Sequence, residues 1–331
     1  MPPAAPTAPS ILHHLRPGPL LYRFWHAPVS ALRESLRQGG PLVQHRVRQG
    51  MKAMESSVST LVPLCFDQAA APLSPHLLTG ARFWYQSAYC LQSLSFHSRR
   101  PLAPVIHDDG SLQPHQVAEL RRLFPSLTLV TGGEARARLD QLLPESRFPT
   151  LRERWRAYPH IRKLLDVHLG SQGWKLVLDS DLLFFRAPSL LVAWCDAPDR
   201  PLVATDCMES YGYTRPLMAR LCGHEPGARV NVGLCGLRSE DIDWERLEHW
   251  TTTLIREEST HYYLEQALTA MLVAGRPVLQ APDSDYRTFP TREEALAPTA
   301  AMHHYVDLSK RWYFSSCWRD CMGAQAPRAR A

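Results

Sequence analysis

Short apolar runs alternate along this chain with stretches whose apolar residues recur at helical spacing. The runs have the length of buried strands, and the amphipathic stretches have the length of surface helices. Strands are predicted at residues 59–66, 102–106, 127–131, 174–178, 202–205, 230–237 and 277–280, and helices at residues 80–96, 114–124, 151–169, 239–256 and 262–274. Strands that alternate with helices pair in parallel through right-handed crossovers. The pattern therefore predicts an α/β fold with a mostly parallel central sheet flanked by helices.

The two ends of the chain differ in character from this middle part. Residues 1–10 are rich in Pro and Ala, a composition typical of disorder, and residues 11–56 alternate Leu, Phe and Trp with Arg. The alternation predicts one or two amphipathic helices that pack on their own domain, with contact to a membrane surface as the alternative. We therefore expect an N-terminal helical extension at 1–57, one large domain at 58–322 and a flexible tail at 323–331.

Composition narrows the class of protein and its partners. The 331 residues are 45% hydrophobic and 21% charged, which describes a soluble globular protein. No apolar run is long enough to cross a bilayer, and the first residues lack the charged-then-apolar order of a secretory signal. We expect a cytoplasmic protein, with peripheral contact at the inner face of the membrane as the alternative. The net charge of +5 comes without a dense basic run, so no nucleic-acid partner is expected.

Two carboxylates end one of the predicted strands. Asp179 and Asp181 follow the apolar run at residues 174–178, within the sequence Val-Leu-Asp-Ser-Asp. Alternate residues of an extended chain point the same way, so both acids face one side at the carboxyl end of a buried strand. That edge is where open α/β sheets bind ligands, and two hard oxygen ligands suit Mg²⁺ or Mn²⁺ carrying a diphosphate. A pair of acids at this spacing also occurs by chance in surface loops.

Three further patterns follow in order. They are Arg-Val-Asn-Val-Gly-Leu at 229–234, Tyr-Leu-Glu-Gln-Ala-Leu at 263–268 and His-Tyr-Val-Asp-Leu-Ser-Lys-Arg-Trp at 304–312. With the Asp-Ser-Asp, which resembles a DXD motif, this ordered set resembles the GT-A (Rossmann-like) glycosyltransferases. It is most similar to family 8, which contains glycogenin and the lipooligosaccharide galactosyltransferases, and the resemblance covers roughly residues 58–315. The chain departs from the family at Asp307, where the family has glycine, at Arg311, where it has proline, and at Glu265, where it has aspartate.

The resemblance implies a metal site and a cation beside it. Asp179, Asp181 and His304 would hold the divalent ion, with His303 as the alternative if the register differs by one residue. A nitrogen ligand favours Mn²⁺ over Mg²⁺. Lys310 would neutralise the departing diphosphate, where negative charge grows in the transition state.

The resemblance also implies a set of residues that bind the donor. They are Asp108, Arg162, Lys163, Asn231, Gly233 and Gln266, of which Arg162 fits the register of the family's donor-binding cation better than Lys163 does. Asp206 would bind hydroxyls of the donor sugar. Glu265 and Asp206 are the carboxylates available as the nucleophile of a double displacement. If neither acts as the nucleophile, a front-face route assisted by the diphosphate and Lys310 applies.

The implied activity is a metal-dependent transfer of a hexose from a nucleotide sugar, expected to be a UDP-sugar, to an acceptor hydroxyl with retention. The acceptor would be a glycan, a glycolipid, a small molecule or a protein side chain. Two other classes stay open. A nucleotidyltransferase also uses paired acids, and a carbohydrate-binding protein with the GT-A shape could lack catalysis.

Overall fold

The computed structural model describes residues 37, 39–66 and 71–322. Its contacts divide the chain into residues 1–49 and residues 50–331, and helix α3 (Gly40–Ser57) crosses this division. The predicted disordered start and the predicted tail at 323–331 lie outside the described residues. So does the part of the helical extension before α3, except residues 37 and 39. Within the described part, no helix combines the length and the apolar character that a membrane span requires.

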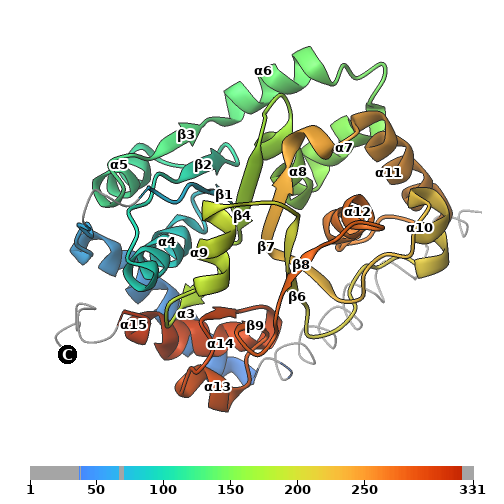
Figure 1. Cartoon of the computed structure of the whole chain (residues 1–331). Helices are drawn as coiled ribbons and strands as arrows, with labels where there is room; N and C mark the ends of the chain where they lie inside the picture. The colour runs from blue at the N-terminus through green and yellow to red at the C-terminus, as the bar shows by residue number, and fades with distance from the viewer. Residues whose placement is uncertain (1–36, 38, 67–70, 323–331) are drawn as a thin grey trace, which may run out of the picture. The chain divides into compact units, whose positions relative to one another are not determined.

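A seven-stranded sheet forms the centre of residues 50–331 (Figure 1). The strands are β1 (Pro75–Thr79), β2 (Val105–Asp108), β3 (Thr128–Val130), β4 (Trp174–Leu178), β6 (Leu202–Thr205), β7 (Val230–Arg238) and β8 (Leu279–Ala281). Their order in the sheet is β3-β2-β1-β4-β7-β6-β8, and β7 is antiparallel to both of its neighbours while the other pairs are parallel. The predicted α/β fold with a mostly parallel sheet is confirmed.

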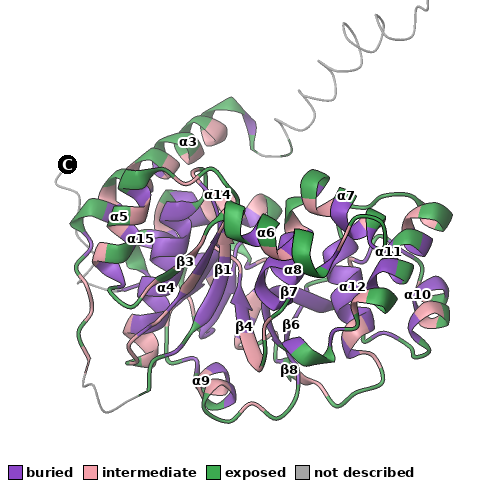
Figure 2. Cartoon of the chain, turned by 90° about the horizontal axis from the view of Figure 1, so that it is seen from above, coloured by how far each residue is buried: buried purple, intermediate pink, exposed green. Residues whose placement is uncertain are grey.

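Helices cover the sheet on both faces. They are α4 (Trp84–Ser98), α5 (Pro114–Leu123), α6 (Gly132–Leu142), α7 (Pro149–Ala157), α8 (Arg162–His168), α9 (Ser189–Asp196), α10 (Arg215–Cys222), α11 (Trp244–Glu258), α12 (Leu264–Val273), α13 (Arg292–Leu296), α14 (Lys310–Trp312) and α15 (Trp318–Asp320). Figure 2 shows that α4, α8 and the central strands are mostly buried. All residues of α8 are buried, including Arg162, Lys163, Asp166 and His168. Buried charges need partners, so α8 must contribute to a polar network.

Two elements differ from their predictions. The strand predicted at 59–66 is wrong: residues 58–60 form a 3-10 turn, and the first strand is Pro75–Thr79. Pro75 is tolerated because it is the first residue of the strand. The helix predicted at 151–169 is broken into α7 and α8 at Tyr158, whose backbone is extended (φ −135, ψ 90) because the next residue is Pro159.

A second, three-stranded sheet lies beside the end of β4. It consists of β5 (Leu182–Phe184), β9 (Tyr286–Thr288) and β10 (Met302–His304), with β10 in the middle. β10 pairs antiparallel with β5, and His304 lies opposite Leu182. The amide of Tyr305 then donates to the carbonyl of Asp181 over 3.1 Å. This pairing brings His304 to Asp181 across more than 120 residues of sequence.

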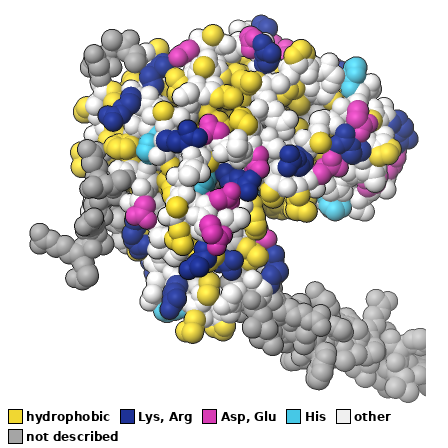
Figure 3. Space-filling view, turned by 60° about the horizontal axis from the view of Figure 1, so that its bottom comes forward, with side chains coloured by type: hydrophobic (Ala, Val, Ile, Leu, Met, Phe, Trp, Pro, Cys, Tyr) yellow, Lys and Arg dark blue, Asp and Glu magenta, His cyan; other side chains and the backbone are white. Residues whose placement is uncertain are grey.

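Charges of both signs share the surface. On the face shown in Figure 3, Lys and Arg side chains are interspersed with Asp and Glu side chains. Arg215, for example, bonds Glu209 and Glu225, each over 2.7 Å. Exposed pairs of this kind contribute little to stability. They reduce the positive field that the arginine content would otherwise produce.

Three buried histidines lie on two central strands and on α8. The ring nitrogens of His76 on β1 and His107 on β2 lie 3.0 Å apart, and His168 on α8 bonds Ser239 over 3.0 Å. Burial lowers the pKa of His76 to about 4 and those of His107 and His168 to about 3. Since an imidazole in the unfolded chain titrates near 6.5, the three rings are neutral in the folded protein at a pH where the unfolded chain already binds protons.

We therefore expect the protein to lose stability as the pH falls from about 6.5 towards 4. Above about pH 6.5 the histidines are neutral in both states, so they do not change the free energy of unfolding. Below it, the unfolded chain binds protons that the folded protein does not, and the free energy of unfolding falls by about 1.4 kcal/mol per pH unit for each histidine. Urea denaturation at pH 7.5 and pH 5 measures this slope. The control is His249→Gln at an exposed position, which should show the same loss of stability between the two pH values. A urea midpoint that does not move with pH would contradict the prediction.

Candidate active site

The two predicted acids lie where β4 and β7 end their pairing. β4 pairs with β7 through Leu178 and Leu234, and the amide of Asp179 donates to the carbonyl of Gly233 over 2.8 Å. On its other side β7 pairs with β6 through a register shift, so that Asn231 lies opposite Ala204. The shift leaves β7 paired with β4 but not with β6 around Gly233. This irregularity gathers Asp179, Asn231 and Gly233 at one edge of the sheet.

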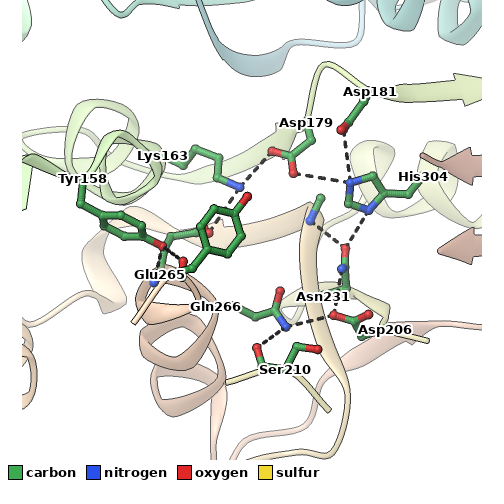
Figure 4. A network of polar contacts seen from close by, with 12 residues as sticks. Tyr158, Lys163, Asp179, Asp181, Asp206, Ser210, Asn231, Glu265, Gln266 and His304 are labelled. Carbon is green, nitrogen blue, oxygen red and sulfur yellow. Dashed lines mark hydrogen bonds and ion pairs between the residues drawn. The ribbon is translucent and has the colours of Figure 1, made fainter. Parts of the chain in front are cut away.

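Asp179, Asp181 and His304 converge on one point (Figure 4). One ligand atom of each lies within 4.8 Å of the other two. Nε2 of His304 is 3.2 Å from Oδ1 of Asp181 and 3.7 Å from Oδ2 of Asp179. Two hard carboxylate oxygens and one imidazole nitrogen form a donor set that Mn²⁺ accepts. The residues therefore fit a divalent cation, and the geometry brings together the three predicted metal ligands.

Each of the two carboxylates has its other oxygen against a lysine. Nζ of Lys163 lies 2.9 Å from Oδ1 of Asp179, and Nζ of Lys310 lies 3.0 Å from Oδ2 of Asp181. Burial alone would raise the pKa of Asp181, but Lys310 and His304 together hold it well below its usual range. Asp181 is therefore ionised at neutral pH and able to bind a cation.

The close approach of His304 requires a glycine at position 233. A Cβ atom on Gly233 would lie 2.3 Å from Cε1 and 2.5 Å from Nδ1 of His304, closer than real contacts allow. The imidazole therefore packs directly on the β7 backbone, and Gly233 shapes the site through His304.

Asp206, Asn231 and Gln266 form a second cluster next to the first. Nδ2 of Asn231 and Nε2 of Gln266 both donate to Oδ2 of Asp206, over 3.1 and 3.0 Å, and Gln266 also donates to the carbonyl of Ser210 over 2.9 Å. The three side chains are at most 7% exposed. One carboxylate oxygen of Asp206 thus accepts both amide groups, and the cluster lies beside the metal ligands.

Glu265 lies on the opposite side of Lys163 from Asp179. Its Oε2 is 3.3 Å from Nζ of Lys163, and its amide donates to the hydroxyl of Tyr158 over 3.3 Å. Burial raises the pKa of Glu265 to about 7, although Lys163 opposes that shift. Burial acts in the other direction on Lys163, but Asp179 and Glu265 together raise the pKa of its ammonium above the ordinary value. Lys163 is thus the cation shared by two carboxylates of the site.

Arg162 and Asp108 have other partners in the structure. The guanidinium of Arg162 donates to the carbonyls of Asp108 and Asp109, over 2.9 and 2.8 Å, and to Asp166 over 2.7 Å. Oδ1 of Asp108 accepts the amides of residues 110, 111 and 112, as in a turn. These bonds tie the turn after β2 to α8. Of the two adjacent basic residues, Lys163 and not Arg162 contacts the acids after β4.

Tyr158 is a site residue that the sequence analysis missed. Its hydroxyl donates to the carbonyl of Tyr262 and accepts the amide of Glu265, so it holds the start of α12. Nothing local in the sequence marks Tyr158, because its partners lie more than 100 residues away. His303, the alternative metal ligand, instead bonds the hydroxyl of Tyr305 over 3.1 Å.

Asp307, where the resembled family has glycine, adopts a left-handed backbone with φ of 45. An L-residue is strained there, and aspartate tolerates the conformation better than most. We expect Asp307→Gly to change the free energy of unfolding by less than about 0.5 kcal/mol, because relief of strain offsets the greater freedom of the unfolded chain. Asp307→Val should cost about 1–2 kcal/mol, since a β-branched residue is disfavoured at positive φ. Urea denaturation of both variants measures the difference, and equal stabilities would contradict it.

This chain is similar to known proteins in its three-dimensional structure. No protein-family model matches the chain, and no curated protein matches it in sequence. The structure is similar to that of mouse xyloside xylosyltransferase 1, with 14% identity and a TM-score of 0.46 over 70% of this chain and 98% of that one. It is also similar to the galactosyltransferase LgtC in complex with donor and acceptor sugar analogues, with 13% identity and a TM-score of 0.48 over 77% of this chain and 92% of that one. A third likeness is to the glycosyltransferase GlyE of Streptococcus pneumoniae TIGR4, with 13% identity and a TM-score of 0.45 over 76% of this chain and 62% of that one. With identities this low, what the chain does has to be inferred from its own site.

Proposed function

We propose that this chain is a metal-dependent GT-A glycosyltransferase that moves a hexose from a nucleotide sugar, expected to be a UDP-sugar, to an acceptor hydroxyl. One observation carries the proposal: the ligand atoms of Asp179, Asp181 and His304 converge at the carboxyl end of β4. Paired carboxylates with an imidazole at such an edge suit a cation that binds a diphosphate. The ordered motifs of the sequence agree with this assignment.

The residues around the three ligands have separate tasks in the proposed reaction. When bound, the divalent ion would neutralise the diphosphate of the donor and weaken its bond to the sugar. Oδ1 of Asp206 and Oε1 of Gln266 would accept hydrogen bonds from hydroxyls of the hexose, since both N–H groups of Gln266 already have partners. Lys310 lies on the outer side of Asp181 and is 40% exposed, so it can turn towards a diphosphate. There it would stabilise the charge that grows as the sugar–phosphate bond breaks.

Retention of the anomeric configuration can follow two routes. In a double displacement, a carboxylate attacks the anomeric carbon as the diphosphate leaves, and the acceptor hydroxyl then displaces the carboxylate while losing its proton to a base. Glu265 and Asp206 are the available carboxylates, but Glu265 is paired with Lys163 and Asp206 holds two amides. In the front-face route the acceptor hydroxyl gives its proton to the departing diphosphate. Because both carboxylates are engaged, we favour the front-face route with Lys310.

A panel of nucleotide sugars tests the proposed donor. Each sugar is added with Mn²⁺, and the melting temperature is measured. A donor present at about a hundred times its Kd adds about 2.7 kcal/mol, which corresponds to roughly 5–10 °C for a domain of this size. The stabilisation should need Mn²⁺ and be lost in Asp181→Ala. The proposal fails if no nucleotide sugar stabilises the protein in the presence of the ion.

The products then separate the alternatives. Release of the nucleoside diphosphate on incubation with donor and acceptor supports the glycosyltransferase, whereas release of pyrophosphate from a nucleoside triphosphate indicates a nucleotidyltransferase. Binding of the donor without any turnover, including hydrolysis, indicates a carbohydrate-binding protein. Glycans, glycolipids, small molecules and peptides are the acceptor classes to compare.

Lys310→Ala is expected to lower kcat by more than about tenfold while donor affinity changes less. A charge that meets the leaving group mainly in the transition state acts on turnover, and one charge-assisted hydrogen bond of about 1.5–3 kcal/mol gives a loss of that size. Lys310→Arg should recover only part of it, because a planar guanidinium does not replace a compact ammonium. Steady-state kinetics measure both, with the exposed Lys52→Ala as control. Wild-type kinetics in Lys310→Ala would remove this residue from the site.

A further inference from the structure

We propose that Asn231 is a positioning residue that holds the ring of His304 in one orientation and one tautomer, with Nε2 open to the metal. The inference rests on the proposed metal site and deepens it. The sequence resemblance implied that Asn231 binds the donor, whereas its contacts in the structure point to the metal ligand. Oδ1 of Asn231 lies 3.1 Å from Nδ1 of His304, on the side of the ring away from Asp181 (Figure 4).

The orientation of the Asn231 amide follows from its two other partners. Oδ1 accepts the backbone amide of Gly233 over 2.9 Å, and that group can only donate. Nδ2 faces Oδ2 of Asp206 over 3.1 Å, and that oxygen is an acceptor because it also receives Nε2 of Gln266. Exchanging oxygen and nitrogen would set donor against donor and acceptor against acceptor. The oxygen of Asn231 therefore faces His304.

The tautomer of His304 then follows from the amide. An amide oxygen can only accept, so Nδ1 of His304 carries the proton and donates to Asn231. In the neutral ring this leaves the lone pair on Nε2, the atom that lies 3.2 Å from Asp181 and 3.7 Å from Asp179. A metal ligand needs that lone pair. Partners that orient a ligating histidine in this way raise metal affinity about 10–100-fold.

The positioning group is itself held rigidly. Asn231 is 5% exposed and His304 is 4% exposed, so water does not replace their hydrogen bond. Asp206, which accepts from Asn231, also accepts from Gln266, and Gln266 is held by the carbonyl of Ser210. The orientation of the metal ligand is therefore set by a chain of bonds that begins in the loop after β6.

Two substitutions at Asn231 test the inference, with Mn²⁺ alone as the probe and no nucleotide sugar present. Free Mn²⁺ is followed by electron paramagnetic resonance during titration. Asn231→Leu removes the acceptor and should raise the Kd for Mn²⁺ by about 10–100-fold. Asn231→Asp keeps an oxygen against His304 and Gly233, and because two facing buried carboxyl groups share one proton it also keeps a hydrogen bond to Asp206. Its Kd should therefore stay near the wild-type value. The control is Thr251→Val, which removes a buried hydrogen bond on α11 and should leave the Kd unchanged.

The pattern across the variants distinguishes the explanations. A role in sugar contact alone predicts no change of Mn²⁺ affinity in either variant, and general damage to the site predicts a loss in both; each result overturns the inference. A wild-type protein that binds no Mn²⁺ overturns the metal site and the inference together. Intact Mn²⁺ binding without any transfer of sugar overturns the proposed reaction alone.

A measurement on the wild-type protein does not depend on the variants folding. With ¹⁵N-labelled histidine and diamagnetic Zn²⁺, an ion that accepts imidazole nitrogen, the ring nitrogens of His304 should show a protonated Nδ1 and a metal-bound, unprotonated Nε2. The opposite tautomer, with the proton on Nε2, overturns the inference even if the substituted proteins do not fold.

Discussion

Asp181→Ala is expected to lower transferase turnover by about a thousandfold or more while the protein stays folded. The substitution removes one of three ligands from the metal site, and it also removes the carboxylate that holds Lys310 and His304. Stabilisation of the leaving group by a bound cation is worth several kcal/mol, and each 1.4 kcal/mol is about tenfold in rate. Activity is measured as release of the nucleoside diphosphate, and folding by circular dichroism.

Removal of the ion should have the same effect as loss of the ligand. EDTA should abolish turnover, and added Mn²⁺ should restore it in the wild-type protein but not in Asp181→Ala. The control is Asp199→Ala, because Asp199 is an exposed carboxylate that pairs with its neighbour Arg200 on the surface. Full activity of the wild-type protein in chelator would disprove the metal site, and full activity of Asp181→Ala would remove that residue from it.

Lys163→Met is expected to have the largest effect on stability, a loss of about 3–5 kcal/mol, because it leaves the buried Glu265 and the partly exposed Asp179 without their cation. Lys163 is 6% exposed and serves both Asp179 and Glu265. Methionine has a similar volume, so packing changes little and the loss reports the charge. Equilibrium denaturation in urea measures it, with the exposed Lys52→Met as control.

A double variant separates the two partners of Lys163. In Lys163→Met/Glu265→Gln only Asp179 is left without the cation, so part of the loss should be recovered. Asp179 is 28% exposed on its side chain and keeps access to water, whereas Glu265 is 7% exposed. Glu265 should therefore account for most of the penalty. A double variant no more stable than Lys163→Met would contradict this division.

The local sequence was sufficient to predict those features of the site that depend on residues close together along the chain. The strand at 174–178 and the two acids after it were predicted at the residues where they occur, because an apolar run and alternation along an extended chain are local properties. The family resemblance, and not the local sequence, marked position 307 as one where glycine is usual, and the φ of 45 at Asp307 gives the physical reason.

The tertiary structure decided everything that depends on which distant groups meet. Arg162 and Lys163 are adjacent and equally basic, and only the packing of α8 directs Lys163 to Asp179 and Arg162 to two backbone carbonyls. His303 and His304 point to opposite sides of β10 because neighbours on a strand alternate, and only the pairing of β10 with β5 shows which one reaches the acids. Tyr158 carries no local mark at all. The sequence by itself determines which residue types are present and how they are spaced. Which of two adjacent side chains reaches the site depends on the pairing of distant segments. The free energy of that pairing is shared among many residues, so no short segment of the sequence reveals it.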